Sequence, residues 1–303
     1  MADPSSETSL DRGQWTVRHI QPTRRSVIEL IRSGTLDAEL AASVWVLIEQ
    51  RVPLLVAAAA PGTGKTTLLD AFLDLLPTNL RIVELAGAAE TFDWLPQATE
   101  LGWSRPTAGG SRVRRLDPPV RPDDTILLVP ELSDHLPSYS WGAEARLAIR
   151  AASIGYGLAA TIHADTLEEV LDSLRRPPVG ADDDELSRLG LVLVLRRVAD
   201  GRRRVSAAHY IRPTARDEHG HVQRLGPAVL ATWDPNHDRF EHFGWGIIPE
   251  LASRIGWHAG DFEVEVERRR DYLDGLAAAG IDGIDDVRTA VAGYRSLLPT
   301  TPN

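Results

Sequence analysis

The amino-acid sequence predicts an α/β fold in which a mostly parallel β-sheet carries helices on both faces. Two observations predict it. Apolar runs typical of strands buried on both faces alternate along the chain with segments whose apolar residues recur at helical spacing. One such run, residues 53–59, leads directly into a glycine-rich turn and then into a helix. Strand, glycine-rich turn and helix in this order are the context of a phosphate-binding loop.

The chain before this turn is predicted to contain a disordered tail, one strand and two helices. The tail is the polar segment 1–12, and the strand is residues 14–20, in which apolar residues alternate. The helices are expected over residues 23–33 and 35–50, with the threonine that opens each segment as its N-cap.

After the turn, the apolar spacing predicts a helix over residues 67–76, ended by a proline. Buried strands are expected at 81–85, 125–129 and 158–163, with a helix at 142–153. Two β-hairpins follow, at 191–198 with 204–211 and at 229–233 with 238–243, and then three helices at 247–255, 261–279 and 285–298. The predicted domains are the tail 1–12, a linker strand with helices 13–50, the core with its hairpins 51–245, and a C-terminal helical section 246–303 packed on the core.

Composition excludes several classes of protein. The 303 residues are 43% apolar, which allows a large core, and no apolar run is long enough to span a membrane. The polar N-terminus lacks the apolar segment of a signal peptide, so a cytoplasmic protein is expected. The absence of cysteine excludes disulfides and cysteine-ligated zinc. The net charge of −10 argues against a general nucleic-acid surface, and the arginine clusters at 112–115 and 202–204 are interpreted as solvated turns.

The glycine-rich turn, AAPGTGKT from Ala59 to Thr66, has the residue types that a phosphate site needs. Gly62 and Gly64 let backbone N–H groups curl around a phosphate, and the following helix N-terminus adds partial positive charge. Lys65 would bridge β- and γ-phosphate oxygens, and the Thr66 hydroxyl would hold Mg²⁺. With ATP as the expected ligand, the predicted nucleotide-binding residues are Pro61, Gly62, Thr63, Gly64, Lys65, Thr66 and Thr67.

One compositional feature supports this interpretation. Of the 33 basic residues, Lys65 is the only lysine. A planar guanidinium does not replace a compact ammonium that must act as a point charge inside a tight loop. A phosphate site that needs an ammonium group explains why lysine is kept at this position alone.

Two further residues are predicted to act beside the loop. Glu131 follows an apolar strand, and there a carboxylate would help to hold the metal and orient a water molecule. His163 ends another apolar strand and would reach the same sheet edge as a sensor of the γ-phosphate. A Glu that caps a loop and a structural His are the alternative readings.

Several motifs together resemble one family. These are the TIHA segment at 161–164, the loop GKTTLLDAFLDLLP, the RPD segment at 121–123 before the Glu131 strand, and the run ATWDPNHDRFE. The chain is similar in them to the secretion-type ATPases of type II secretion, type IV pili, archaella and type IV secretion, especially the archaeal-like branch. The resemblance covers roughly residues 14–294.

The resemblance implies a RecA-like P-loop NTPase core in a hexameric ring, which couples ATP hydrolysis with Mg²⁺ to work on a membrane platform protein at the inner face of the cell membrane. It implies that Glu131 is the Walker B glutamate, that His163 belongs to the family's His box, and that Glu90 is what remains of its acidic box. Arg105 resembles an arginine that faces nucleotide, although an exposed loop arginine is an equal interpretation.

The chain also departs from the family pattern. The acidic box keeps Glu90 alone, the arginine that normally follows the Walker B glutamate is missing, and the N-terminal domain that commonly precedes the linker is expected to be absent. Loss of these charges near phosphate weakens metal binding and transition-state stabilisation.

Two main hypotheses follow. The first is an active motor ATPase of a secretion or pilus-like machine. The second is a nucleotide-binding structural or regulatory subunit with weak or no hydrolysis, in a homo-hexamer or a mixed ring. An AAA+ ATPase ranks lower, because its Walker B strand would end in Asp-Glu where this chain has Pro130-Glu131. A small-molecule kinase ranks lower still, and no direct nucleic-acid contact and no zinc are expected.

Overall fold

The structure of the chain is a computed structural model, which describes residues 24–104, 116, 118–216, 219 and 221–297. The predicted tail 1–12, the predicted strand 14–20, Arg105 and the arginine cluster at 112–115 lie outside the described residues.

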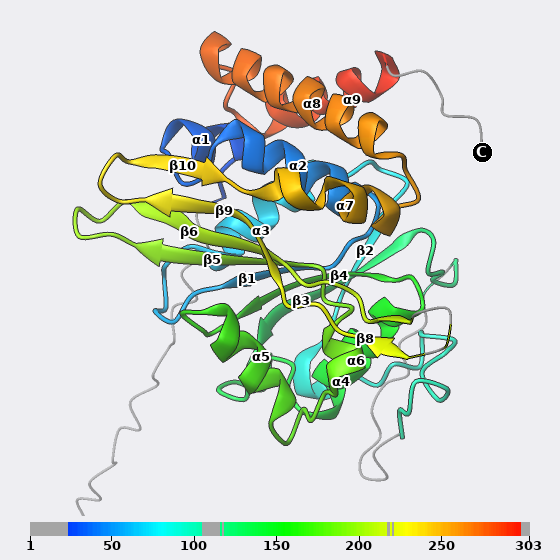
Figure 1. Ribbon diagram of the computed structural model, residues 1–303. Helices are drawn as coiled ribbons and strands as arrows, with labels where there is room; N and C mark the ends of the chain where they lie inside the picture. The colour runs from blue at the N-terminus through cyan, green and yellow to red at the C-terminus, as the bar shows by residue number, and fades with distance from the viewer. Residues whose placement is uncertain (1–23, 105–115, 117, 217–218, 220, 298–303) are drawn as a thin grey trace, which may run out of the picture.

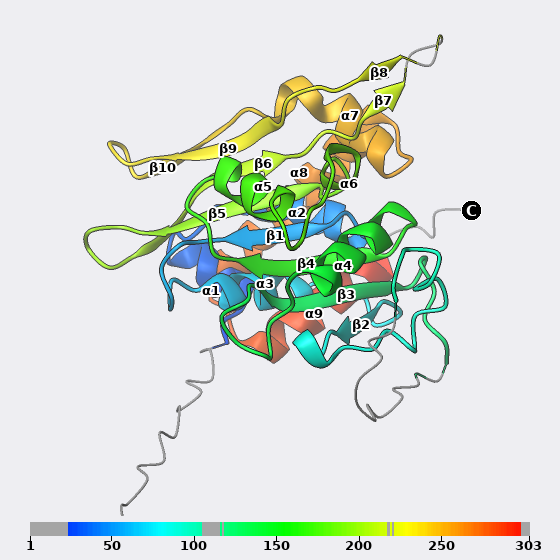
Figure 2. The same cartoon turned by 90° about the horizontal axis from the view of Figure 1, so that it is seen from below.

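Eight strands form one sheet in the order β10-β9-β6-β5-β1-β4-β3-β2. Figure 2 shows this order, with β9 and β10 at the top of the view and β2 at the bottom. The five strands from β5 to β2 are parallel, and β6, β9 and β10 extend them in antiparallel pairs. The strands are β1 Leu54–Ala57, β2 Arg81–Glu84, β3 Thr125–Leu132, β4 Gly157–Ile162, β5 Leu191–Arg197, β6 Arg203–Tyr210, β9 Ala228–Asp234 and β10 Arg239–His242. A separate pair consists of β7 Ala215–Arg216 and β8 Val222–Gln223.

Helices cover both faces of the sheet (Figure 1). On one face lie α1 Val27–Arg32, α2 Ala38–Glu49, α3 Lys65–Leu73, α7 Ile248–Arg254, α8 Ala259–Ala279 and α9 Ile284–Leu297. On the other lie α4 Ala143–Ser153, α5 Leu167–Arg175 and α6 Asp183–Leu186, and short 3₁₀ turns occupy Gly87–Ala89 and Gly244–Ile247. The sheet separates two hydrophobic cores, because successive side chains of a strand point to opposite faces. In β1, Leu54 and Val56 belong to the core on the α2 side, and Leu55 and Ala57 belong to the core on the α4 side. The predicted α/β class with a mostly parallel sheet is confirmed.

The C-terminal helices share one hydrophobic core with the first two helices. Trp45 of α2 packs on Tyr294 of α9 with ring centroids 5.4 Å apart, and the Arg269 guanidinium of α8 lies 4.4 Å from the centroid of the same indole. The predicted domain divisions at residues 51 and 246 remain predictions. Among the described helices, none is long and apolar enough to cross a membrane.

The predicted threonine cap of the second helix is wrong, and the first helix starts from a serine. Ser26 caps α1 and forms a reciprocal capping box with Glu29, whereas Asp37 caps α2 by accepting from the Leu40 N–H. The Thr35 carbonyl accepts from the Val205 N–H of β6, and the Thr35 hydroxyl lies 3.1 Å from that of Ser33. The cap of α2 comes instead from Asp37, two residues later.

Both predicted hairpins are present, as β5–β6 and β9–β10. The helices α5 and α6 were not predicted, although each begins with a local signal. Thr166 accepts from the Glu169 N–H at the start of α5, and Asp182 forms a capping box with Glu185 at the start of α6.

Candidate functional site

The glycine-rich turn joins β1 to α3 in a conformation that requires its glycines. Gly62 and Gly64 have φ of 72° and 106°, which is the left-handed region that disfavours side chains. A Cβ at Gly64 would also lie 3.1 Å from the Cδ atom of Arg203. Gly64 is the N-cap of α3, so the helix begins at Lys65, two residues earlier than predicted, and its N-terminus faces the turn.

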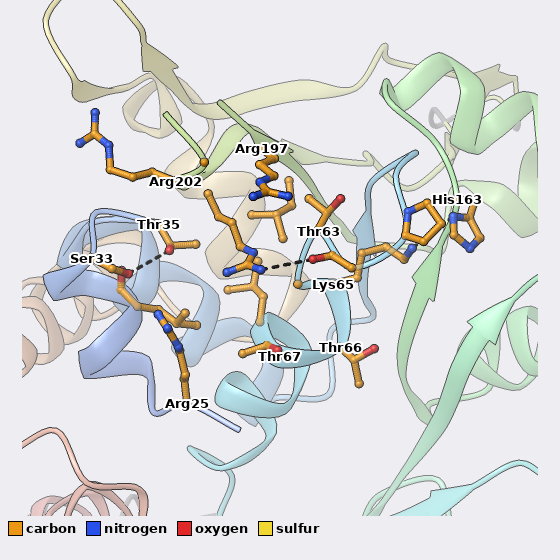
Figure 3. A pocket seen from close by; sticks show the side chains of 18 of the residues that line it. Arg25, Ser33, Thr35, Thr63, Lys65, Thr66, Thr67, His163, Arg197 and Arg202 are labelled. Atoms are coloured by element: carbon orange, nitrogen blue, oxygen red, sulfur yellow. Dashed lines mark hydrogen bonds between the residues drawn. The ribbon is translucent and has the colours of Figure 1, made fainter. Parts of the chain in front are cut away.

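A cavity of about 920 Å³, called here the loop cavity, lies over this turn. All seven residues predicted to bind nucleotide line it, and so do Glu131 and His163. Figure 3 shows Lys65 and His163 together at one end of the cavity, with Arg25, Ser33 and Thr35 at the other end. Arg197 and Arg202 approach from the β5–β6 hairpin.

Lys65 is buried at the floor of the loop cavity, with 6% of the residue exposed. Its ammonium lies 3.5 Å from Oε2 of Glu131, 3.3 Å from Nδ1 of His163 and 3.4 Å from the carbonyl oxygen of Ala58. Burial lowers the pKa of Lys65 from its ordinary value, and the charge and hydrogen bond of Glu131 oppose that shift. The lysine therefore holds its charge by means of the neighbouring carboxylate.

Glu131 is positioned by an irregularity in β3. The pairing of β3 with β4 shifts register between Val129 and Leu132, where Pro130 has no N–H for the ladder. The Thr161 hydroxyl of β4 lies 2.9 Å from Oε2 of Glu131 and 2.5 Å from the Pro130 carbonyl, so its one proton serves either acceptor. The other carboxylate oxygen, Oε1, is buried and has no hydrogen-bond donor within the described part of the chain.

His163 follows the last residue of β4 and completes the cluster. Its Nε2 atom lies 3.8 Å from Oε1 of Glu131, and its Nδ1 atom lies 3.2 Å from the carbonyl of Ala59 as well as near Lys65. Glu131 and His163 lie at the carboxyl ends of the neighbouring parallel strands β3 and β4, and Lys65 begins α3 after the loop that follows β1. The expectation that they share one sheet edge therefore matches their places in the fold.

Glu90 lies apart from this cluster and is not among the residues lining the loop cavity. Its carboxylate accepts hydrogen bonds from the backbone N–H groups of Ala86, Thr91 and Phe92 and from the Trp94 indole. These bonds organise the turn after β2. The proposed catalytic role of Glu90 remains a prediction, as does that of Arg105, which the structure does not describe.

The reading of residues 202–204 as a solvated turn is wrong for two of the three arginines. Arg203 donates to the carbonyl of Gly62 over 3.3 Å, and Arg204 is 2% exposed. Arg204 donates to Asp238 at 3.0 Å and to the Ser33 carbonyl at 2.9 Å. The sequence did offer a signal, because Arg204 already lay inside the predicted strand 204–211. An arginine within a strand needs a partner for its charge.

The residues present fit a magnesium ion held largely by a bound phosphate. Thr66 lines the loop cavity, and Oε1 of Glu131 is a buried acceptor to which none of the described residues donates. Mg²⁺ is commonly held by one or two carboxylates together with substrate phosphates and water. Within the described ranges, no group of three His, Cys, Asp or Glu side chains forms a metal site made of protein alone.

Comparison with known proteins places the chain in a family. A model described as type II/IV secretion system protein matches residues 8–212, which is more than half of the chain. The chain belongs to the type II/IV secretion system protein family. The resemblance found in the TIHA segment and the phosphate loop is thereby confirmed.

Among curated proteins, two uncharacterized proteins of Methanocaldococcus jannaschii are similar to the chain. One is 26% identical over 261 residues, covering 82% of this chain and 90% of the relative. The other is 25% identical over 310 residues, covering 98% of this chain and 54% of the relative. The chain thus spans most of the first relative and about half of the second.

Two solved structures are also similar to this family member. The VirB11 ATPase from the Brucella suis type IV secretion system, in complex with sulphate, is 21% identical with a TM-score of 0.38, over 65% of this chain and 60% of that chain. The Legionella pneumophila ATPase DotB is 14% identical with a TM-score of 0.31, over 75% of this chain and 55% of that chain. This chain therefore spans less than two thirds of either structure's chain.

Proposed function

We propose that this protein is an ATP-binding motor ATPase of a type II/IV secretion or type IV pilus-like machine, coupling ATP hydrolysis to assembly or secretion. The observation that carries the proposal is the meeting of Lys65, Glu131 and His163 at one end of a cavity lined by the whole phosphate loop. Family membership supports it, because the matched residues 8–212 contain all three side chains.

Binding of ATP would exchange the partner of Lys65. The backbone N–H groups of the loop and the α3 N-terminus would surround the β-phosphate, and Lys65 would turn from Glu131 to the β- and γ-phosphate oxygens. The carboxylate of Glu131 would then be free to accept a hydrogen bond from the attacking water and orient it. Thr161 would hold that carboxylate in place, and His163 would contact the γ-phosphate.

Thr66 and Glu131 would hold Mg²⁺ beside the phosphates. The chemistry that this ion supplies when bound is neutralisation of the charge on the β- and γ-phosphate oxygens. At the other end of the loop cavity, Arg25, Ser33 and Thr35 offer donors and acceptors for the rest of the nucleotide.

We propose that the protein acts in a ring, either a homo-hexamer or a mixed ring, on a membrane platform protein of its machine. It would work in the cytoplasm, at the inner face of the cell membrane, through that partner and not through nucleic acid. Membership of the type II/IV secretion system protein family supports this class of machine.

The test is ATP turnover and oligomer size of the purified chain with Mg²⁺ and ATP, beside Lys65→Ala and Glu131→Gln. Lys65→Ala should abolish nucleotide binding, and Glu131→Gln should retain binding and lose turnover. Glu263→Gln, an exposed residue of α8, is the matched control and should behave like the unaltered chain. ATP binding without turnover under ring-forming conditions would exclude the motor.

A second candidate is a nucleotide-binding subunit that does not hydrolyse ATP, with a structural or regulatory role in a mixed ring. The placement of Glu90 favours it, because the remaining acidic-box carboxylate binds its own turn and does not line the loop cavity. Robust hydrolysis by the isolated chain would exclude this candidate.

A further inference from the structure

A second cavity lies at the opposite end of the sheet from the phosphate loop. It has a volume of about 890 Å³ and is called here the arginine cavity. Pro53 and Tyr156, which precede β1 and β4, line it together with Tyr210, the last residue of β6. It therefore faces the amino ends of the same parallel strands whose carboxyl ends surround the loop cavity. Nothing in the proposed reaction uses it.

The lining of the arginine cavity is strongly basic in a chain of net charge −10. Four arginines line it, Arg51, Arg188, Arg212 and Arg254, against one carboxylate, that of Glu250. Glu250 lies 2.9 Å from Arg212. Within the described residues, Arg51, Arg188 and Arg254 form no ion pair with a carboxylate. Three positive side chains thus line the cavity without a paired carboxylate in the described part of the chain.

Arg254 and Arg188 are neighbours in this lining. Arg254 donates to the backbone carbonyl of Arg188 over 2.9 Å. Burial and the charge of Arg188 both lower the pKa of Arg254, although the nearby Tyr210 raises it. A guanidinium remains protonated in spite of such shifts. Repulsion between these charges therefore lowers the stability of the folded protein.

Buried donors at this cavity also lack acceptors. The Tyr210 hydroxyl and the Nε atom of Arg51 are buried and have no hydrogen-bond partner within the described part of the chain. Tyr210 is fully buried, and burial raises its pKa, so its hydroxyl keeps its proton. A buried polar group without a hydrogen-bond partner destabilises the folded protein. A cavity lined by four arginines and one carboxylate, and by a protonated hydroxyl that has no acceptor in the described part of the chain, fits an anion with several oxygens.

We propose that the arginine cavity is a second anion site, which binds a phosphate group between Arg51, Arg188, Arg254 and the Tyr210 hydroxyl. A phosphate fits better than a carboxylate, because it offers acceptor oxygens in several directions to donors that come from separate elements. The phosphate belongs either to a small soluble molecule or to a lipid headgroup. This inference is independent of the proposed ATPase activity.

The test measures binding of inorganic phosphate by isothermal titration in a Lys65→Ala background, in which the phosphate loop is disabled. We expect binding that falls about tenfold or more with Arg254→Met and about tenfold with Tyr210→Phe, since hydrogen bonds to charged groups contribute about 1.5–3 kcal/mol. Arg188→Met changes an exposed residue and gives a second test that does not disturb the core. Arg176→Met, an exposed arginine at the C-cap of α5 that does not line the arginine cavity, is the matched control and should bind as the background does.

A second arm identifies the source of the phosphate. Vesicles of phosphatidylcholine containing phosphatidic acid are floated with the same variants, beside vesicles of phosphatidylcholine alone. Flotation that depends on phosphatidic acid and is lost with Arg188→Met assigns the site to a lipid headgroup, and binding of free phosphate without flotation assigns it to a soluble ligand. The proposal is overturned if neither probe binds, or if Arg188→Met, Arg254→Met and Tyr210→Phe all leave binding unchanged.

Discussion

Lys65 Nζ lies 3.5 Å from Oε2 of Glu131, and each of these two residues is only 6% exposed. The loop's one ammonium is therefore neutralised by the carboxylate that we propose to orient water. Because a phosphate and Glu131 compete for the same charge, occupation of the loop by nucleotide would release the carboxylate for its catalytic role. This exchange yields specific expectations.

We expect Glu131→Gln to lower kcat for ATP by at least about 10²-fold, because an amide cannot accept a proton from water in the way a carboxylate does. Nucleotide affinity should be kept or increased, since Lys65 then loses its competing partner. Single-turnover rates and titration with a fluorescent ATP analogue measure the two effects. Turnover that survives in this variant would remove Glu131 from the proposed site.

The pKa of Lys65 should fall further in Glu131→Gln, because the carboxylate opposes the lowering caused by burial. Isotope labelling of lysine at Cε yields one resonance, since the chain has a single lysine. Its titration by NMR measures the pKa directly. Bound ATP should raise the value through the phosphate charges, and an unchanged titration in the variant would contradict the ion pair.

The same group contributes to the pH dependence of stability. The native pKa of Lys65 lies below its unfolded value, so between the two values the unfolded chain binds more protons. Across that window this group makes the free energy of unfolding rise with pH. Lys65→Met should remove that contribution. Denaturant unfolding of both proteins along a pH series isolates it as the difference between the two curves.

Arg203 should position the phosphate loop through its bond to the Gly62 carbonyl. We expect Arg203→Ala to raise KM for ATP by about tenfold, as loss of a charge-assisted hydrogen bond implies. Arg203→Lys should restore part of the affinity. Arg239→Ala, which removes an exposed arginine of β10, serves as control. Equal KM values for Arg203→Ala and the control would show that the contact does not matter for binding.

Glu90→Gln should lower the free energy of unfolding by about 1–3 kcal/mol, since an amide group would then face N–H donors that now bind a carboxylate. Chemical denaturation measures the loss. The kcat of the folded variant tests the catalytic role that the sequence pattern proposes for Glu90. An unaffected kcat together with reduced stability would leave Glu90 a structural role alone.

Local signals in the sequence predicted the elements of this fold well. The apolar runs gave the parallel strands, the AAPGTGKT turn gave the loop, and the turns at Asp200-Gly201 and Pro235-Asn236 gave the two hairpins. The caps were less predictable. Thr35 has a side chain that can cap a helix, but its carbonyl accepts from Val205 of β6. The helix begins after Asp37, whose side chain is the cap. A strand with a proline, as at Pro130, could have indicated the bulge that positions Glu131.

The sequence by itself determined which residue types the chain carries at the ends of its strands, because hydrophobic periodicity and turn chemistry act over a few neighbouring residues. Tertiary structure alone decided which of them meet. Arg203 reaches Gly62 across 141 positions of sequence, and the arginine cavity joins segments from Gln50 to Arg254. Strand order and register set these contacts, since a side chain's partner depends on which strand lies beside it and not on its own neighbours in the chain.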